Sequence, residues 1–226
     1  MSGTVGTQTS ASEAALRAAA ERQIAVTRKT GRPASSTLDQ RVARRRQEML
    51  LKERREAEYH QARVLLLIDA LAGKSSALDG LTKLAKLDFL LRYPVFLEEL
   101  ANSGVDALQL SDDTKPTPEE RSTVESRMMR YKYGPWDDRY YGIIGALVGR
   151  GLVEYVSGKR GNIALRPTDG GRALARLLAT DPAWRLTAAR CAVLHRAFAR
   201  KSGNAIKSLI YDRLPDVVDR PHRTEI

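Results

Sequence analysis

Residues 136–178 have the sequence WDDRYYGIIGALVGRGLVEYVSGKRGNIALRPTDGGRALARLL. Apolar side chains recur at helical spacing from Asp138 to Arg150, and Gly151 supplies a stop directly after them. This spacing places the apolar side chains on one face of a helix, with the polar side chains on the other. The first half of the stretch therefore predicts an amphipathic helix that ends at the glycine.

A β-hairpin and a second helix are expected in the rest of the same stretch. Residues 152–156 and 163–165 are two β-prone runs, and a glycine-bounded tip at residues 157–161 separates them. This pattern predicts a two-stranded wing. Thr168 suits a helix N-cap, and the leucines after it repeat as the buried face of another helix. Helix, wing and helix follow in the order that a winged helix requires.

Further helical patterns surround this module and predict a mainly α fold with a small β-wing. We interpret the chain as an elaborated winged helix with a long N-terminal helical extension and C-terminal helices. The expected domains are a basic helical extension at 1–60, partly disordered at its start, a winged-helix domain with an insertion at 61–180, and a basic helical segment at 181–226. The further helical patterns cover residues 13–28, 36–72, 81–92, 95–100, 119–131, 184–200 and 204–213.

Composition limits the possible classes of protein. A length of 226 residues with 42% hydrophobic residues suits one core with extensions and leaves little room for a separate enzyme domain. The sequence shows no apolar run near the length of a membrane span and no signal peptide at its start, so we expect a cytoplasmic protein without a membrane segment. Cys191 is the single cysteine, which excludes a disulfide or thiolate cluster within the chain, and its helical surroundings predict a packed residue.

The net charge of +11 is concentrated at the two ends of the chain. Residues 1–60 contain 12 basic and 7 acidic residues, residues 61–183 contain 17 and 16, and residues 184–226 contain 9 and 4. The central part is therefore nearly neutral, while each flank has an excess of 5 positive charges. Such flanks favour contact with an anionic surface, and charge alone does not separate nucleic acid from an acidic protein.

Two groups of cations are candidate nucleic-acid contacts. Lys159 and Arg160 lie at the predicted wing tip, where a projecting wing reaches a phosphate or an acidic neighbour. The other group lies on the N-terminal helix, where a solvated helix face is the alternative interpretation. Its members are Arg41, Arg44, Arg45, Arg46, Lys52, Arg54 and Arg55.

The helix that would read a major groove has few charged residues. They are Asp137, Asp138, Arg139 and Arg150. Two acids at its N-terminus suit capping and would repel a DNA backbone, so the sequence argues against a groove-reading role.

Aromatic residues cluster around the Gly134–Pro135 turn. Core packing is the first interpretation of this cluster, and a protein interface is the second, because aromatic side chains often anchor such contacts. The cluster, which we treat as the candidate partner interface, consists of Tyr131, Tyr133, Trp136, Tyr140 and Tyr141.

The sequence contains no pattern that indicates catalysis, a cofactor or a metal. Gly73 begins a GKS tripeptide, but Ile68 stands where a phosphate-binding loop needs its first glycine, so we interpret it as a helix-ending turn. His60, His195 and His222 are scattered without metal-ligand spacing. No serine, cysteine or carboxylate is part of a nucleophile motif. We therefore expect a protein that is not an enzyme and needs no cofactor.

Two segments resemble a family of bacterial defence proteins. KLAKLDFLLRYP, at residues 83–94, and RMMRYKYGPWDDRYYGIIGALVGRGLVEY, at residues 127–155, resemble the middle component of three-component ABC-ATPase systems, a group that includes the small subunit of Lamassu-type antiphage complexes. The resemblance covers residues 62–180, and the YGPWD turn leading into the RYY helix is its specific part. It implies a winged-helix subunit in a DNA-sensing complex, with an SMC-like or ABC ATPase and an effector, commonly a nuclease. It names no catalytic residue.

The residue patterns and the resemblance lead to the same functional hypothesis. We expect a non-enzymatic adaptor that links ATPase and effector subunits and contacts DNA, if at all, without sequence specificity. The alternative is a winged-helix transcription regulator, which requires a dimer, two half-sites and a base-reading helix.

Overall fold

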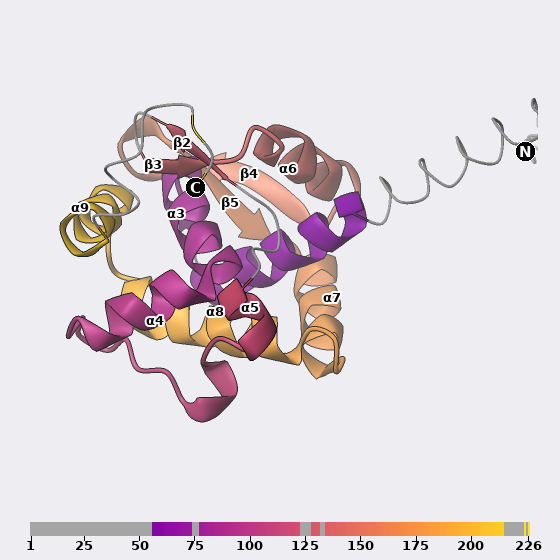
Figure 1. The fold of residues 1–226 in the computed structure, drawn as a ribbon. Helices are drawn as coiled ribbons and strands as arrows, with labels where there is room; N and C mark the ends of the chain where they lie inside the picture. The colour runs from indigo at the N-terminus through magenta and orange to yellow at the C-terminus, as the bar shows by residue number, and fades with distance from the viewer. Residues whose placement is uncertain (1–55, 74–76, 123–127, 132–133, 215–223, 225) are drawn as a thin grey trace, which may run out of the picture. The chain divides into compact units, whose positions relative to one another are not determined.

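A computed structural model gives the fold of the chain, and it describes residues 56–73, 77–122, 128–131, 134–214, 224 and 226 (Figure 1). These residues belong to a compact unit that spans residues 55–226. The described part is mainly helical with a small antiparallel sheet of three strands, so the predicted fold class is confirmed at this level. Residues 1–54 lie outside the described residues, and the helices expected there stay predictions.

Most of the helices expected within the described residues are confirmed. The described α-helices are an unlabelled helix at residues 56–72, α3 (Leu81–Arg92), α4 (Pro94–Asn102), α5 (Pro118–Ser122), α6 (Tyr140–Gly149), α7 (Asp169–Thr180), α8 (Arg185–Phe198) and α9 (Gly203–Arg213). Two short 3-10 helices, η1 (Asp112–Thr114) and η2 (Lys159–Gly161), lie in loops.

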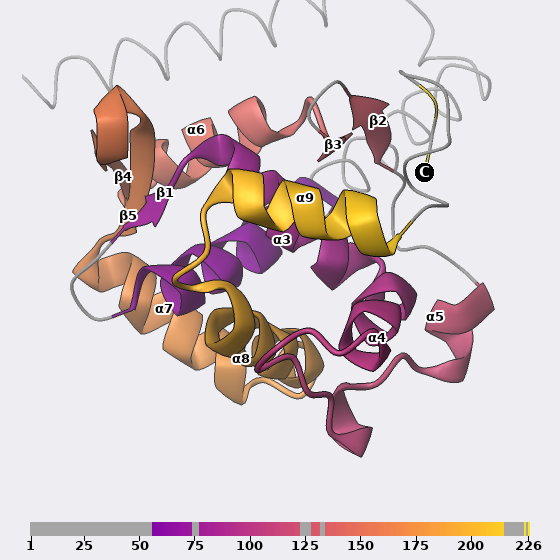
Figure 2. The same ribbon diagram turned by 90° about the vertical axis from the view of Figure 1, so that its left-hand side faces the viewer.

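Helix α3 is the centre of the core. Every residue from Lys83 to Arg92 is buried, and α3 packs against α4, α8 and α9. Figure 2 shows α9 lying across α3. Leu84, Leu87 and Leu90 are fully buried, and burial of one such side chain contributes about 2 kcal/mol. This explains why the leucine repeat was sufficient to predict a core helix.

The three-stranded sheet contains the predicted wing and one strand that the sequence did not reveal. Strands β4 (Val153–Ser157) and β5 (Ile163–Pro167) pair antiparallel, which confirms the predicted hairpin. Strand β1 (Leu78–Asp79) pairs antiparallel with β5, so the strand order is β1-β5-β4. A strand of two residues is too short to show an alternating pattern.

The two helices that flank the wing also follow the prediction. In α6 the side chains of Ile143, Ile144 and Leu147 are buried, and Gly151 ends the helical segment with a φ of 68°. That angle lies in the left-handed region, which glycine adopts without strain. At the start of α7, Thr168 Oγ1 accepts the Gly171 N–H at 3.0 Å, which confirms the predicted N-cap.

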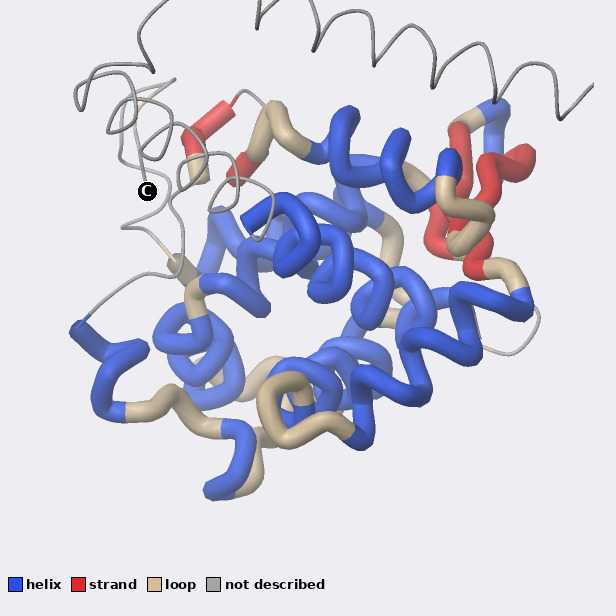
Figure 3. The backbone as a smooth tube through the Cα atoms, turned by 90° about the vertical axis from the view of Figure 1, so that its right-hand side faces the viewer, coloured by secondary structure: helices blue, strands red, loops and turns tan. Residues whose placement is uncertain are grey.

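The helix predicted over residues 119–131 is confirmed only at its start, and its end is wrong. Residues 123–127 lie outside the described residues. Helix α5 ends at Ser122, and strand β2 (Met129–Tyr131) pairs antiparallel with β3 (Gly134–Trp136) where a helix end and a turn were expected. The C-terminus contributes to this arrangement, because the Arg130 N–H donates to the carbonyl of Thr224 at 2.8 Å. Figure 3 shows this hairpin and the wing on either side of α6.

The C-terminal helices are part of the same core as the wing and α3. Helices α8 and α9 confirm the patterns at residues 184–200 and 204–213, and Phe198, Ile206 and Ile210 are fully buried. The buried Arg190 connects α8 to α5, because its Nη1 and Nη2 donate to Glu120 at 2.6 and 2.8 Å. The segment predicted as 181–226 thus contributes helices to one compact unit with the rest of the described chain.

Candidate functional site

Helix α6 has an exposed, uncharged face made of one tyrosine and three glycines. Tyr141 is 65% exposed, and Gly142, Gly145 and Gly149 are exposed on the same helix. Among the described residues, no atom outside the adjoining backbone of α6 itself lies within 4 Å of the position that a Cβ atom would take at any of these three glycines. The backbone of α6 is therefore open to close approach by another backbone.

The same face lacks the side chains that read bases. Direct readout in a major groove depends on Arg, Lys, Asn or Gln, and helix α6 (YYGIIGALVG) contains none of them. Arg139 precedes the helix and forms an ion pair with Asp137, with 2.7 Å between Nη2 and Oδ2. Arg150 follows the helix and is about half exposed. The charges at the two ends of α6 thus flank an uncharged surface.

The aromatic cluster divides between the core and the surface. Tyr140 is 1% exposed, and its hydroxyl donates to Asp88 Oδ2 at 2.7 Å. This corrects its assignment to the partner interface, since α6 turns it inward, where no partner reaches it. Trp136 is half-buried and packs edge-on against Tyr140, with ring centroids 5.4 Å apart. Tyr141 lies outside, 5.9 Å from the Trp136 ring.

Two other members of the cluster have no described side chain. Tyr131 contributes backbone to β2, and Tyr133 lies outside the described residues. Among the described residues, the exposed part of the candidate partner interface is therefore Trp136 and Tyr141, and the exposed glycines of α6 lie beside it.

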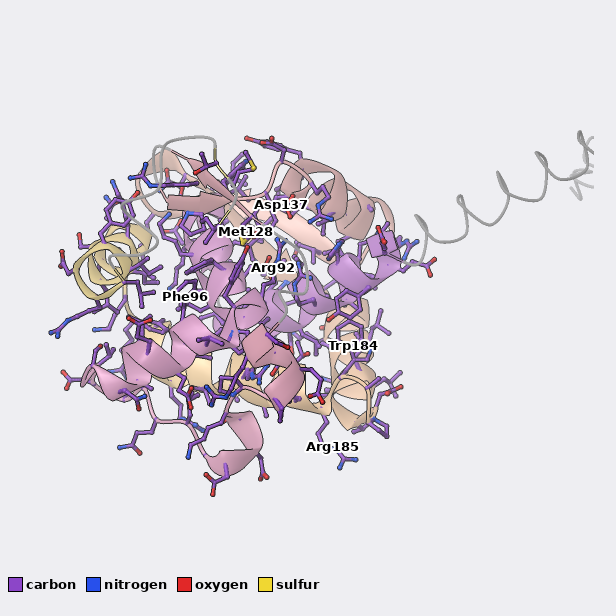
Figure 4. The ribbon with its side chains drawn as sticks, viewed as in Figure 1. Arg92, Phe96, Met128, Asp137, Trp184 and Arg185 are labelled. Atoms are coloured by element: carbon purple, nitrogen blue, oxygen red, sulfur yellow. The ribbon has the colours of Figure 1, made fainter. Side chains whose placement is uncertain are left out.

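A buried charge network connects α6 to the core. Asp88, in α3, is fully buried and accepts Arg63 Nε at 2.7 Å and Arg63 Nη2 at 3.2 Å. Asp137, just before α6, accepts Arg92 Nη1 at 2.7 Å, and Figure 4 shows these two side chains next to each other inside the molecule. The network therefore joins helix 56–72, α3 and the start of α6.

The two carboxylates of the network stay ionised. Burial by itself raises the pKa of Asp88, but the charge and hydrogen bonds of Arg63, together with Arg92, outweigh it and leave that pKa below its ordinary value. Burial also opposes ionisation of Asp137, and hydrogen bonds from Arg139 and Arg92 hold its pKa far below the usual range. The paired charges compensate one another in the interior.

His60 lies between two guanidinium groups of this network. Its Nδ1 is 2.8 Å from Arg63 Nη1, and its Nε2 is 3.0 Å from Arg139 Nη1. A neutral imidazole offers one acceptor nitrogen, whereas a protonated ring would place two donors against these cations. Burial and the charges of Arg63, Arg139 and Arg92 lower the pKa of His60 to about 4, although the charge of Asp88 opposes this.

The free energy of unfolding is expected to fall as the pH falls from about 6.5 to 4. In this window the unfolded chain binds a proton at His60, while the folded chain does so only near the pKa of about 4. The expected contribution is on the order of 2 kcal/mol. His60→Gln keeps an acceptor but does not titrate, so its urea unfolding curves at about pH 7, 6 and 5 should show a shallower dependence. If the free energy of unfolding falls equally steeply with pH in the wild type and in His60→Gln, the lowered pKa of His60 is contradicted.

The candidate nucleic-acid contacts are only partly described. The cations of the N-terminal helix, Arg41 to Arg55, lie outside the described residues, so their role stays a prediction. Lys159 is exposed in η2, and its backbone N–H donates to Asp79 Oδ1 at 3.2 Å, which holds the wing tip against β1. Arg160 contributes backbone to η2, and its side chain is not among those described.

Three of the other residues considered in the sequence, Cys191, Gly73 and His195, are described. Cys191 is buried, as predicted, and burial raises the pKa of its thiol well above the ordinary value. Gly73 ends the first described helix with a φ of 63°, and residues 74–76 lie outside the described residues. His195 is half-buried in α8, and His222 is not described. Among the described residues, no cluster of three metal-ligand side chains occurs, and no helix is long and apolar enough to span a membrane.

The buried network is not evident from the sequence patterns. Asp88 and Arg92 interrupt the apolar run of α3, and Arg63 precedes the apolar run of helix 56–72. Charges placed inside core helices are a signal for buried pairing, because an unpaired charge is rarely buried. Their partners could not be assigned without the tertiary structure.

Comparison with family models, with curated proteins and with solved structures gave no match for this chain.

Proposed function

We propose that this chain is a non-enzymatic winged-helix adaptor that links an SMC-like or ABC ATPase to an effector nuclease in an antiphage defence complex. The topology supports the winged-helix part of the proposal. Helix 56–72, β1, α3, α6, β4 and β5 occur in the winged-helix order, with β1 as the strand between the first two helices. Residues 93–139 then form an insertion between the second helix and the recognition-type helix.

The exposed face of α6 is the main observation that favours an adaptor. In a DNA reader this helix inserts into the major groove and uses polar side chains to bind base edges. Here the outward positions are Tyr141 and three glycines with open space above them. A surface of this kind lets a partner backbone approach closely, and the two aromatic side chains beside it suit a protein contact.

The buried network supports the same role by holding α6 in place. Asp137 accepts the backbone N–H of Arg139 at 3.0 Å at the start of α6, and it is itself bonded to Arg92 of α3. A docking helix that is fixed before binding loses less conformational entropy when its partner binds. The network thus favours a preformed docking surface.

The resemblance to the middle component of ABC-ATPase defence systems supports the choice of partners. Its specific part, the YGPWD turn and the RYY helix, corresponds to β3 and the start of α6. Trp136 and Tyr141 of the proposed docking surface belong to these elements. The alternative function, transcription regulation, needs base contacts that α6 does not offer.

Gly145→Leu is expected to reduce recovery of the partner subunits about tenfold or more, because a branched side chain would occupy the space that a partner backbone needs. The tagged chain would be co-expressed with its neighbouring genes, and the amount of each subunit that co-purifies with it would be measured. Ala173→Leu, on the exposed side of α7, is the matched control and should leave recovery unchanged. Thermal unfolding would show that both variants fold.

Two outcomes would contradict the proposal. The first is equal partner recovery for the wild type, Gly145→Leu and Ala173→Leu. The second is a chain that purifies alone and binds one DNA sequence at physiological salt, which would support the transcription regulator instead.

A further inference from the structure

A groove of about 1090 Å³ lies between the wing and the C-terminal helices. Its walls come from β1, η2, β5, the start of α3, the loop between α8 and α9, and the start of α9. Figure 2 shows the start of α9 beside β1 and the wing. No residue of α6 lines this groove, so it is distinct from the proposed docking surface.

Positive charge predominates in the groove. Lys83, Lys159, Arg200 and Lys201 line it, and Asp79 is the single acidic residue among the described lining residues. The formal charge of these described residues is therefore +3, from four cations and one anion. Asp79 is already engaged, because its Oδ1 accepts the backbone N–H of Lys159. Cations gathered in a concave site attract an anionic ligand.

Lys83 differs from a surface lysine because its side chain is buried. It is 8% exposed, and its Nζ donates to the carbonyl of Ala199 at 2.8 Å. Burial lowers the pKa of Lys83, and the charge of Lys159 adds to this, while the charge of Asp79 opposes it. A desolvated ammonium with three N–H groups gains more from an anionic partner than a solvated one does.

The groove also offers backbone donors and apolar surface. The first residues of α3 and α9 line it, and helix N-termini favour negative charge. Leu71, Leu81 and Ile163 are also among the lining residues, and Ile163 is 55% exposed. Sites for small organic ligands combine apolar walls with a few polar groups and enclose about 300–1,000 Å³. The groove is thus larger than a bare phosphate ion needs.

We propose that this groove binds a nucleoside phosphate. The phosphates contact Lys83, Lys159 and the Arg200–Lys201 pair, and the nucleoside lies against the apolar wall. Residues 74–76, which contain the end of the GKS tripeptide, are outside the described residues and are no part of the site. The proposal is independent of the docking surface on α6.

Isothermal titration calorimetry of the full chain with ATP, AMP, inorganic phosphate and adenosine tests this site. ATP is expected to bind more tightly than AMP, AMP more tightly than inorganic phosphate, and adenosine without measurable heat. The double variant Lys159→Gln/Arg200→Gln should weaken ATP binding about tenfold or more. Both side chains are exposed, so this variant should fold even if Lys83→Gln does not.

Lys115→Gln is the matched control, because it removes an exposed cation that does not line the groove. It should leave ATP binding unchanged, and so should Gly145→Leu, which separates this site from the adaptor function. Three results would overturn the proposal: no binding of ATP, GTP, CTP or UTP at millimolar concentration, equal weakening by Lys115→Gln, or binding of DNA that nucleotides do not compete away.

Discussion

Asp88→Asn is expected to lower the free energy of unfolding by about 3–5 kcal/mol. Asp88 is fully buried, and its carboxylate accepts Arg63 and the hydroxyl of Tyr140, with Arg92 Nη1 3.7 Å from Oδ2. Asparagine keeps the volume but removes the charge, and its amide donors face other donors. Two buried guanidinium groups would then be left with too little negative charge.

Urea unfolding followed by circular dichroism measures this effect. Asp112→Asn is the matched control, because Asp112 pairs with Lys115 on the exposed surface and should not shift the midpoint. The double variant Arg63→Gln/Asp88→Asn should lose less free energy of unfolding than the two single variants lose in sum, because the two residues share one interaction. A loss below about 1 kcal/mol for Asp88→Asn would show that the network does not stabilise the fold.

Gly171→Ala is expected to cost about 3 kcal/mol of stability. Gly171 is buried in the first turn of α7, where an added Cβ atom would meet the backbone carbonyl oxygen of Leu152. This carbonyl also accepts the N–H of Thr168 at 3.0 Å, so it cannot move without weakening the entry to α7. Backbone atoms have no alternative rotamer that would relieve the contact.

The neighbouring glycine provides the control for this substitution. At Gly170 the nearest atom to an added Cβ is Thr168 Oγ1 at 3.8 Å, an ordinary contact. Gly170→Ala should therefore stabilise the protein by about 0.5 kcal/mol, since alanine loses less backbone entropy on folding. Denaturant midpoints of the two variants should move in opposite directions. Midpoints that move together would contradict the close approach of α7 to the wing.

The periodic elements could be predicted because local apolar spacing reflects burial. The leucines of α3 recur at helical spacing, and so do the buried apolar residues of α6, which are Tyr140, Ile143, Ile144 and Leu147. Both helices form where that spacing indicated. The β2–β3 hairpin was missed because β2 also binds Thr224, which is distant in sequence and accepts the N–H of Arg130. Strand β1 was missed because it forms by pairing with β5, which is also distant from it in sequence.

The candidate site was predictable only as a set of residue types. The cluster around Trp136 was recognised as aromatic, but neighbouring residues on a helix face different ways, so Tyr140 became a core residue and Tyr141 a surface residue. The poor charge of α6 was visible in the sequence. The open space above Gly145 and the pairing of Asp88 with Arg63 could not be predicted, because both depend on how other elements pack around these residues.

The sequence by itself determined the helix, wing and helix order of residues 136–178, because hydrophobic period, glycine stops and the Thr168 cap act over a few residues. Only the tertiary structure decided that β1 joins the wing, that buried arginines and aspartates hold α6, and that Lys83 meets Lys159 and Arg200 in one groove. These features depend on long-range packing, which brings together side chains that no local pattern relates.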